Sequence, residues 1–594
     1  MSKIIENLAD IGLSFWRNLK HVFVSIARLL LDTIFRLVNL ILPLTTLAYM
    51  FKQRAPGLWR ALMKVGFIKR MVSRNVFRKF GSAAPARPHA FSLAADYTTW
   101  ESLTDRAYTG RHLPPISLEQ SANLPPQEKI IDLFMRQPDA SGRPQQIDCI
   151  RSTFMFAAFA QWFTDSFLRT DHAFDFDDCG NVKRDSAGAP LRLPGREKRN
   201  TSTHEIDLCQ IYGLNARQTD ILRLKSETDR GCLKFQSGDD GEYPPFLLSA
   251  KPANGQTPLA VKPEFKDLHP DERILRSIFL RADHNDRGYE TIFAAGLEHS
   301  NATIGNALLN TIFLREHNRV ARLIAAANPS WDDERVFQTT RNVMIVLLLK
   351  IVISDYIRHI SPLNLPLEFQ PGFAEAQGWF RTNRISIEFN LLYRWHGLVP
   401  NEFSFMPSPA DPNAFRHNNN WLLQNGVAKA VSVFSREKAG RIGIGNTVPY
   451  LRGVKADTVT LMRAARLAPY NAYRKRFGLS PAKTFDDVTK DKAHAARLSA
   501  LYDGDIGRLE WYVGMTSEDH GPDMIMGELL MCMVAHDAFT QALTNPLLSI
   551  EAFREETFSP AGWAVINETS TLSHIIDRIT GGGSVFCAFS HAPA

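Results

Sequence analysis

Apolar residues recur every three or four positions over long stretches of this 594-residue chain, and this periodicity constrains its fold most strongly. The stretches are 150–169, 218–224, 302–327, 332–359, 384–395, 457–477, 493–502 and 523–543. Strand signals are few and short, and we find no internal repeat. Irregular stretches rich in Gly, Pro and charge, such as 172–200 and 361–378, separate the helical ones. We therefore predict a mainly α-helical protein.

Basic residues concentrate at the N-terminal end. Residues 1–90 hold 15 Lys and Arg but only three acidic residues, a net charge of +12, whereas the remaining 504 residues carry −5. Apolar and basic residues alternate there at helical spacing. The longest uncharged run, 37–51, is shorter than the ~20 apolar residues of a membrane-spanning helix. The pattern is typical of amphipathic helices lying in an anionic membrane surface, with a single span or a partner-binding helix pair as alternatives.

Three further features limit the compartment and the partners. No cleavage site of a secretory signal follows the early apolar run, so we do not expect secretion. A nucleic-acid-binding arm would contain far less Leu, Ile and Phe, so we expect no nucleic-acid partner. The six cysteines show no CxxC spacing, which indicates neither a zinc site nor a disulfide framework. This fits a reducing compartment such as the cytoplasm.

A tyrosine and a histidine form the first candidate site, in the motif Tyr393-Arg-Trp-His396. A helical conformation of this stretch would place the phenol and the imidazole on one face. A histidine can hold haem iron axially while a nearby tyrosine exchanges an electron with the porphyrin. From the spacing alone, an ordinary surface or hydrogen-bonded histidine is the alternative.

A polar pair on an apolar helix forms the second candidate site. Gln161 and Asp165 lie four residues apart in a stretch that is otherwise Phe, Trp, Ala and Met. Buried polar groups need partners, so the pair indicates a lined cavity or a bound ligand. A helix end that reaches solvent near Asp165 is the alternative.

Two other clusters have a structural or weaker interpretation. Polar side chains crowd the stretch 313–320, and we expect an ionic network between helices there, with His317 not acting as a ligand. The acidic run 171–180 has oxygen ligands for Ca²⁺, but we favour a solvated acidic loop over a calcium site.

Taken together, these segments resemble the animal haem peroxidase superfamily, in its branch of cyclooxygenases (prostaglandin endoperoxide synthases) and fatty-acid α-dioxygenases. The resemblance is collinear from Asp96 to Ser590. Its matching stretches are 96–105, 111–115, 159–164, 211–218, 314–319, 350–356, 388–400 and 469–478, among them Leu314-Arg-Glu-His-Asn-Arg319. It implies a basic amphipathic, monotopic membrane-binding segment over 1–80, a linker over 81–94 and a haem-dependent catalytic domain over 95–594.

The resemblance also implies residue roles and a cofactor, haem b. His396 falls on the proximal haem ligand, with Trp395 beside it in the motif. Tyr393 falls on the radical-bearing tyrosine, and Tyr356 on the tyrosine that hydrogen-bonds it. Gln161 falls on the distal glutamine.

The chain departs from the family pattern in three places. Asp165 stands where a distal histidine is expected, and His299 lies near the position of a distal arginine in mammalian peroxidases of the superfamily. Either could act as the distal base. The serine of the cyclooxygenase pocket has no secure counterpart, with Ala538 and Thr540 as candidates, and the cysteine module of cyclooxygenases is absent.

The resemblance leads us to expect a fatty-acid dioxygenase. A tyrosyl radical on Tyr393 would abstract hydrogen from a long-chain fatty acid before O₂ adds, and Arg74 or Arg78 would bind the carboxylate. A peroxidase of small reductants and a haem-binding lipid-surface protein without activity are the alternatives. We expect a peripheral membrane protein. The sequence leaves open the carbon that is oxygenated, the type of product and the oligomeric state, with a homodimer among the options.

Overall fold

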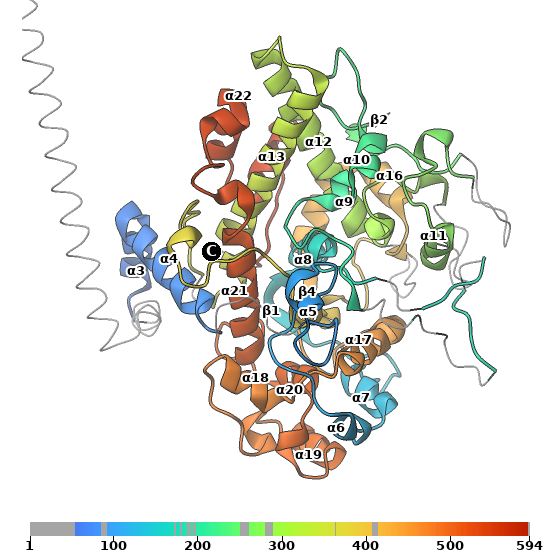
Figure 1. Ribbon diagram of the computed structural model, residues 1–594, viewed down its shortest axis with the longest axis vertical. Coiled ribbons are helices and arrows are strands. Elements are labelled where there is room, and N and C mark those ends of the chain that lie inside the picture. Colours follow the sequence, from blue (N-terminus) through green and yellow to red (C-terminus); the bar gives the residue numbers. More distant parts are fainter. Residues whose placement is uncertain are drawn as a thin grey trace, which may run out of the picture. The chain divides into compact units, whose positions relative to one another are not determined.

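The computed structural model (Figure 1) describes eleven stretches of the chain. They are 54–84, 92–171, 174–178, 181–186, 191, 193, 198–249, 260–279, 289–362, 364–406 and 414–591. Residues 1–53 of the basic N-terminal segment and residues 85–91 of the linker therefore lie outside the described residues. None of the described helices has the length and apolar character that a membrane crossing requires.

The chain divides into two compact units. The first contains the residues up to Lys79 together with Leu365–Glu368, and the second contains Phe80–Asn364 and Phe369–Ala594. The division follows the backbone contacts and does not test the functional boundaries predicted at 80 and 94, which stay a prediction.

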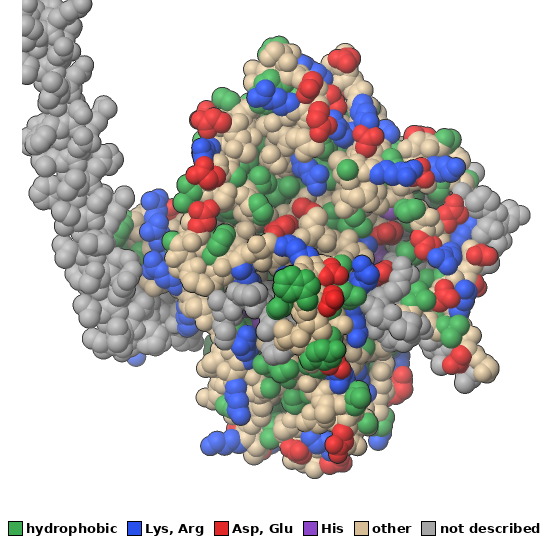
Figure 2. All heavy atoms as spheres, in the orientation of Figure 1, with side chains coloured by type: hydrophobic (Ala, Val, Ile, Leu, Met, Phe, Trp, Pro, Cys, Tyr) green, Lys and Arg blue, Asp and Glu red, His purple; other side chains and the backbone are tan. Residues whose placement is uncertain are grey.

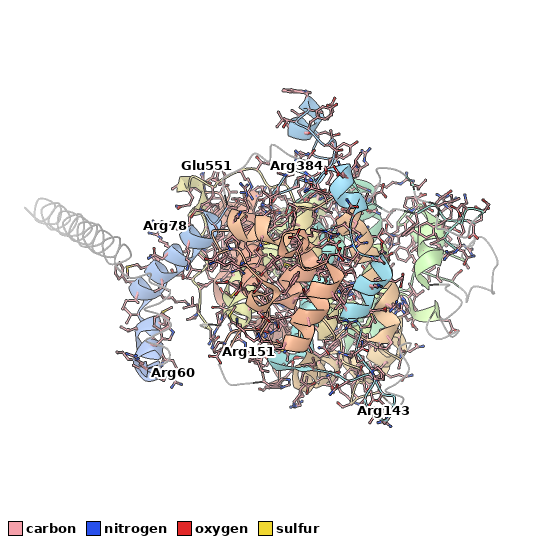
Figure 3. All side chains as sticks on the ribbon, turned by 90° about the horizontal axis from the view of Figure 1, so that it is seen from below. Arg60, Arg78, Arg143, Arg151, Arg384 and Glu551 are labelled. Carbon is pink, nitrogen blue, oxygen red and sulfur yellow. The ribbon has the colours of Figure 1, made fainter. Side chains whose placement is uncertain are left out.

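Two basic helices form the described part of the first unit: α3 (Pro56–Lys64) and α4 (Gly66–Gly81). A short inner face is buried, including Trp59 and Met63 of α3. Arg70 Nε donates to Glu368 Oε1 (2.9 Å), the one ion pair of this unit among the described residues. Figure 3 labels Arg60 on α3 and Arg78 on α4, and Figure 2 shows Lys and Arg side chains along these helices.

The second unit is built mainly from helices, as Figure 1 shows, and the predicted mainly α-helical fold is confirmed. Its longest helices are α12 (Ile304–Ala327) and α13 (Asp333–Ile351), which pack against each other and against α22 (Glu555–Glu568). The other α-helices are α5 (Trp100–Thr104), α6 (Leu118–Ala122), α7 (Gln127–Phe134), α8 (Phe154–Phe167), α9 (Cys209–Tyr212), α10 (Ala216–Leu222), α11 (Glu272–Phe279), α14 (Ile357–Ile360), α15 (Ile387–Leu392), α16 (Asn419–Arg436), α17 (Arg452–Ala464), α18 (Tyr470–Arg476), α19 (Lys492–Leu501), α20 (Trp511–Ser517), α21 (Glu528–Leu543) and α23 (Leu572–Ile579).

The strands of the described residues form two small antiparallel sheets. In one, β1 (Asp148–Thr153) pairs with β4 (Lys438–Gly440) across a register irregularity, and in the other β2 (Gln236–Gly238) pairs with β3 (Gly241–Tyr243). The helix predicted over 150–169 was therefore wrong at its start, where the chain forms the end of strand β1. The backbone stays extended to Thr153, whose side chain caps α8 by accepting from the Phe156 amide.

A polar network on α12 ties helices together, as predicted for 313–320. Glu316, fully buried, accepts from Arg319 Nε (2.8 Å) and from Arg578 of α23 (2.6 Å). His317 Nδ1 accepts from the Tyr212 hydroxyl (2.8 Å), and its Nε2 donates to the Gly231 carbonyl (2.9 Å). Both ring nitrogens serve protein partners, so His317 is a structural residue.

Two predicted helical stretches contain interruptions. The stretch 332–359 continues from α13 into a π-helical turn, η5 (Val352–Tyr356), and then into α14. The stretch 457–477 is two helices, because Arg466 takes a left-handed conformation (φ +46°) between α17 and α18 and Pro469 stands immediately before α18.

Candidate active site

His396 does not share a helix with Tyr393. Helix α15 ends at Leu392, Tyr393 is its C-terminal cap, and His396 begins a separate 3₁₀ turn, η7 (His396–Leu398). A tight turn joins them, in which the Trp395 amide donates to the Tyr393 carbonyl (2.8 Å). Tyr393 and His396 therefore do not lie on one face of a helix, as was expected, because α15 ends before the motif begins.

Close backbone packing fixes the turn that carries His396. A side chain on Gly397 would place a Cβ 2.4 Å from the Arg441 carbonyl, and one on Gly440 would place a Cβ 2.1 Å from the Gly397 carbonyl. Asn446, fully buried, donates to the Gly397 carbonyl (3.2 Å) and the Arg441 carbonyl (2.8 Å). This packing explains the glycines at 397 and 440, where η7 lies against β4.

Four aromatic side chains form a continuous stack between the two candidate tyrosines. Tyr393 stacks on Trp395 with centroids 4.6 Å apart, and Phe156 of α8 lies 6.1 Å from Trp395 at an interplanar angle of 19°. Phe156 also stacks on Tyr356, at 5.3 Å and 21°. Tyr356 belongs to the π-helical turn η5 and is fully buried.

The two phenols lie near each other in an apolar setting. Burial, and then the electrostatic coupling to Tyr393, hold the pKa of Tyr356 well above its usual range. Burial likewise raises the pKa of Tyr393, with a smaller contribution from Asp537. Both side chains are therefore neutral phenols at physiological pH. Neither hydroxyl meets hydrogen-bond geometry with another polar atom of the described residues, although each is close enough to affect the pKa of the other.

The sequence interpretation missed the residues behind His396. Lys455 of α17 is 2% exposed, and its Nζ donates to the Tyr512 hydroxyl (2.8 Å), which in turn donates to the Arg394 carbonyl (2.8 Å). Burial, helped by Arg394, lowers the pKa of Lys455 to about 7. These residues come from α17, α20 and the motif, so no local pattern joins them.

His396 itself is a neutral imidazole. Burial, followed by the charges of Lys455 and Arg394, holds its pKa well below the usual range. Its Nδ1 has no hydrogen-bond partner among the described residues, and neither has Trp395 Nε1. A neutral imidazole is the form that binds a metal.

Gln161 and Asp165 form the accessible stripe of an otherwise buried helix. The other 12 of the 14 residues of α8 are buried, whereas Gln161 is exposed and Asp165 is half-buried. Asp165 lies in the last turn of α8, and the charge of Arg394 acts on both Asp165 and His396. A lined cavity at this pair stays a prediction. The two small cavities that are best defined in the described residues, each about 20 Å³, lie elsewhere.

A second helix holds the Asp165 carboxylate in place. Asn306 Nδ2 of α12 donates to Asp165 Oδ2 (3.0 Å). The Thr303 hydroxyl donates to Asn306 Oδ1 (2.6 Å), which fixes the orientation of that amide. Burial raises the pKa of Asp165 to about 6, although Arg169, Asn306 and Arg394 favour the charged form.

His299 lies in a different electrostatic setting. It belongs to the 3₁₀ turn η4 (Glu298–Asn301), next to Glu298, which pairs with Arg169 (2.9 Å). Arg169, His269 and His299 outweigh burial and lower the pKa of Glu298 to about 2. His299 therefore belongs to a charged cluster around Glu298, whose Arg169 also favours the charged form of Asp165.

The remaining candidates are placed as follows. Thr540 and Ala538 are buried on α21, and Thr540 Oγ1 accepts from Arg381 Nη2 (3.4 Å). Arg74 and Arg78 lie one turn apart on α4, in the first unit. In the acidic loop, Asp175 pairs with Lys183 (2.9 Å) and Asp177 accepts from the Asn181 amide (2.8 Å), and the preference for a solvated loop over a calcium site stays a prediction.

Comparison with known proteins decides the family. The model of the family described as animal haem peroxidase matches residues 131–586, most of the second unit. The chain belongs to the animal haem peroxidase family. As a member of it, the protein is a haem-dependent oxidoreductase.

Relatives of this family member include two prostaglandin G/H synthases. Synthase 1 of Mus musculus is 33% identical over 524 residues, which cover 86% of this chain and 77% of that protein. Synthase 2 of Equus caballus is 31% identical over 544 residues, covering 90% and 80%. A solved fatty acid alpha-dioxygenase of Arabidopsis thaliana shares the fold, with a TM-score of 0.64, 15% identity and 92% of each chain covered.

The residues of this family member fit a haem group. His396 is a neutral, half-buried imidazole whose buried Nδ1 has no hydrogen-bond partner among the described residues, and Gln161 and Asp165 present polar groups from a mostly buried helix. Arg394 lies within charge range of His396 and of Asp165. The donor set of one neutral imidazole is that of haem peroxidases in general.

Proposed function

We propose that this protein is a haem b-dependent dioxygenase that oxygenates long-chain fatty acids through a radical on Tyr393. The observation that carries the proposal is the pair of the half-buried Tyr393 and the fully buried Tyr356, joined to the His396 turn by stacked rings. A phenol with a raised pKa and an apolar shell keeps its proton until it is oxidised, which suits hydrogen-atom transfer. The prostaglandin G/H synthase relatives and the alpha-dioxygenase fold support the substrate class.

The residues of the chain then have distinct roles. His396 would hold the iron, and the haem supplies, with a hydroperoxide as oxidant, the one-electron oxidation of Tyr393. The Tyr393 oxygen radical takes a hydrogen atom from a C–H bond of the fatty acid, which leaves a carbon radical. O₂ adds to that carbon, and the peroxyl radical takes the hydrogen back from Tyr393. The product is a fatty-acid hydroperoxide, and the tyrosyl radical is regenerated.

Asp165 is the group that we assign to proton transfer on the distal side. As a carboxylate it accepts the proton of the incoming hydroperoxide and returns it to the leaving oxygen. Its accessible position beside Gln161 and its anchoring by Asn306 support this role over His299, which serves the Glu298 cluster.

Substrate would reach the body from a membrane surface. In the described part of the first unit, Leu58, Val65 and Phe67 are 52%, 49% and 38% exposed among basic residues, and the helices α3 and α4 contain no acidic residue. Exposed apolar side chains among cations suit an anionic lipid interface. Arg74 and Arg78 remain our candidates for the fatty-acid carboxylate.

Oxygen uptake by the haem-loaded protein tests the proposal. A panel of saturated and unsaturated fatty acids, started with a trace of hydroperoxide, should consume O₂ and yield hydroperoxides identified by mass spectrometry. Tyr393→Phe should lose oxygenation by at least about 100-fold while keeping the haem absorbance, since only the hydrogen acceptor is removed. Tyr470→Phe, a buried phenol bound to Glu518, is the matched control and should keep activity.

The same assay separates the alternatives. Turnover of a guaiacol-type reductant with hydrogen peroxide, without O₂ uptake on any fatty acid, would favour the peroxidase. Full haem content with neither activity would favour a non-catalytic haem protein. Oxygenation that survives Tyr393→Phe would refute the radical assignment.

A further inference from the structure

Three metal-binding side chains converge at a place that the proposed mechanism does not use. His112 lies in the extended stretch before α6, and His536 and Asp537 are neighbours on α21. One ligand atom of each lies within 4.8 Å of the other two, and His112 Nε2 is 3.0 Å from Asp537 Oδ2. It is the one cluster of this kind that the described part of the chain contains.

The cluster is buried, and an aromatic ring packs against both of its histidines. His112, His536 and Asp537 are 3%, 1% and 2% exposed. The ring of Phe477 lies 5.3 Å from the His112 ring and 5.5 Å from the His536 ring. An ionised carboxylate costs several kcal/mol to bury unless a positive charge compensates it, so an ionised Asp537 would be stabilised by a cation, from protein or from solution.

The tautomer of His536 favours a ligand role. Its Nδ1 lies 2.9 Å from the carbonyl oxygen of Phe80, which can only accept, so Nδ1 carries the proton. In the neutral ring the lone pair is then on Nε2. Metal-bound histidines in proteins are oriented in the same way, with the second ring nitrogen donating to a backbone carbonyl or a carboxylate.

The backbone of His112 is fixed from the other side. Its amide donates to Glu388 Oε1 (3.0 Å), and the Tyr473 hydroxyl donates to the same oxygen (2.7 Å). Glu388 is fully buried on α15, the helix that ends at Tyr393. The cluster thus joins one helix, α21, to a loop residue whose backbone is held by α15, as a preformed site requires.

From this geometry we infer that His112, His536 and Asp537 bind a divalent first-row transition metal ion, Zn²⁺ or a close relative, separate from the haem iron. Two imidazole nitrogens and one carboxylate oxygen are the donor set of zinc and related sites that keep open positions. The competing arrangement is a metal-free ion pair between His112 and Asp537.

The inference goes beyond the proposed function and does not depend on it. Asp537 is close enough to Tyr393 to contribute to the raised pKa of that phenol. A cation on Asp537 would offset this negative charge, so the metal would act on the electrostatics of Tyr393 without touching the substrate.

Metal analysis of the full-length, haem-loaded protein tests the site. After chelator treatment and equilibration with Zn²⁺, we expect one zinc per chain in addition to one iron per haem. His112→Gln and Asp537→Asn should each lose the zinc and keep the haem, and His574→Gln, an exposed histidine, should keep both. Zinc absent from the wild-type protein, or zinc retained in both site variants, would overturn the inference and leave the ion pair.

A measurement on the wild-type protein guards against a variant that fails to fold. Zinc X-ray absorption of the loaded protein should show nitrogen and oxygen neighbours with the outer-shell scattering of two imidazoles. Sulfur neighbours, or scattering without imidazole, would place the zinc elsewhere and refute the assignment.

Discussion

At the residue scale, Asp165 shows how a carboxylate can stand where a histidine is expected. Its burial brings the pKa to about 6, close to that of an unperturbed imidazole. The base form exists above this pH. We therefore predict that hydroperoxide activation falls about tenfold for each pH unit below about 6, in stopped-flow haem spectra. Asp165→Asn should abolish this decrease at low pH (the acid limb of the pH profile) together with most of the rate of hydroperoxide activation. An unchanged acid limb in that variant would assign the base to another group.

The Asn306 amide offers a sharper test of the same residue. It donates to Asp165 Oδ2 and so favours the carboxylate. Asn306→Leu removes a hydrogen bond to a charged group, on the order of 1 kcal/mol, and should move the acid limb up by about one pH unit. If the acid limb of the pH profile stays at the same pH, with haem content unchanged, Asn306 does not act through Asp165.

Candidate site residues were predictable where they lie together in one short stretch of the sequence. His396, Tyr393 and Tyr356 were found from short matching stretches, and Gln161 and Asp165 from polar positions on an apolar helix. Lys455 and Asn306 were not, because each acts on the site from a helix far away in the sequence, and only the fold brings them together. Their roles, like those of the motif residues, remain proposals that the variants above test.

At the element scale, the π-helical turn η5 is the local feature that the periodicity could not show. A helix of 332–359 was expected, but the register changes before Tyr356. The structure ties the following helix α14 to β1: the Arg151 guanidinium donates to the carbonyls of His359, Ile360 and Ser361, and Ser152 Oγ lies 2.9 Å from His359 Nε2. π-Helical turns are frequent at functional sites because they re-aim one side chain.

This attachment predicts a local stability effect. Arg151→Met removes the donors that satisfy the last carbonyls of α14, at a cost of about 2 kcal/mol in local opening. Hydrogen exchange of 352–361 should then be about 30-fold faster. Arg143→Met is the matched control, since Arg143 is exposed and, like Arg151, labelled in Figure 3. Equal exchange in both variants would mean that Arg151 does not hold this turn.

At the scale of the whole molecule, the charge split of the sequence corresponds to two units. The net +12 segment 1–90 was predictable from composition, but its extent as a unit was not, because Leu365–Glu368 joins it from the middle of the chain. The Arg70–Glu368 pair explains that addition in part. The fold of the body was predictable as helical, whereas its two small sheets depend on pairing between distant segments.

Membrane attachment is the prediction at this scale. A chain that begins at Phe80 keeps the carbonyl that His536 needs and removes the basic helices. It should stay in the supernatant of sedimented vesicles that contain anionic lipid, while the full chain sediments and is released by high salt. Sedimentation of the shortened protein, with its haem bound, would show that the membrane contact lies in the body.

The most direct test of the central claim is electron paramagnetic resonance of the haem-loaded protein, freeze-quenched after hydroperoxide. We predict a tyrosyl radical that is lost or altered in Tyr393→Phe and kept in Tyr470→Phe. Anaerobic addition of the fatty acid should replace it with a carbon-centred radical. An identical tyrosyl signal in Tyr393→Phe, or a signal that fatty acid leaves unchanged, would contradict the account.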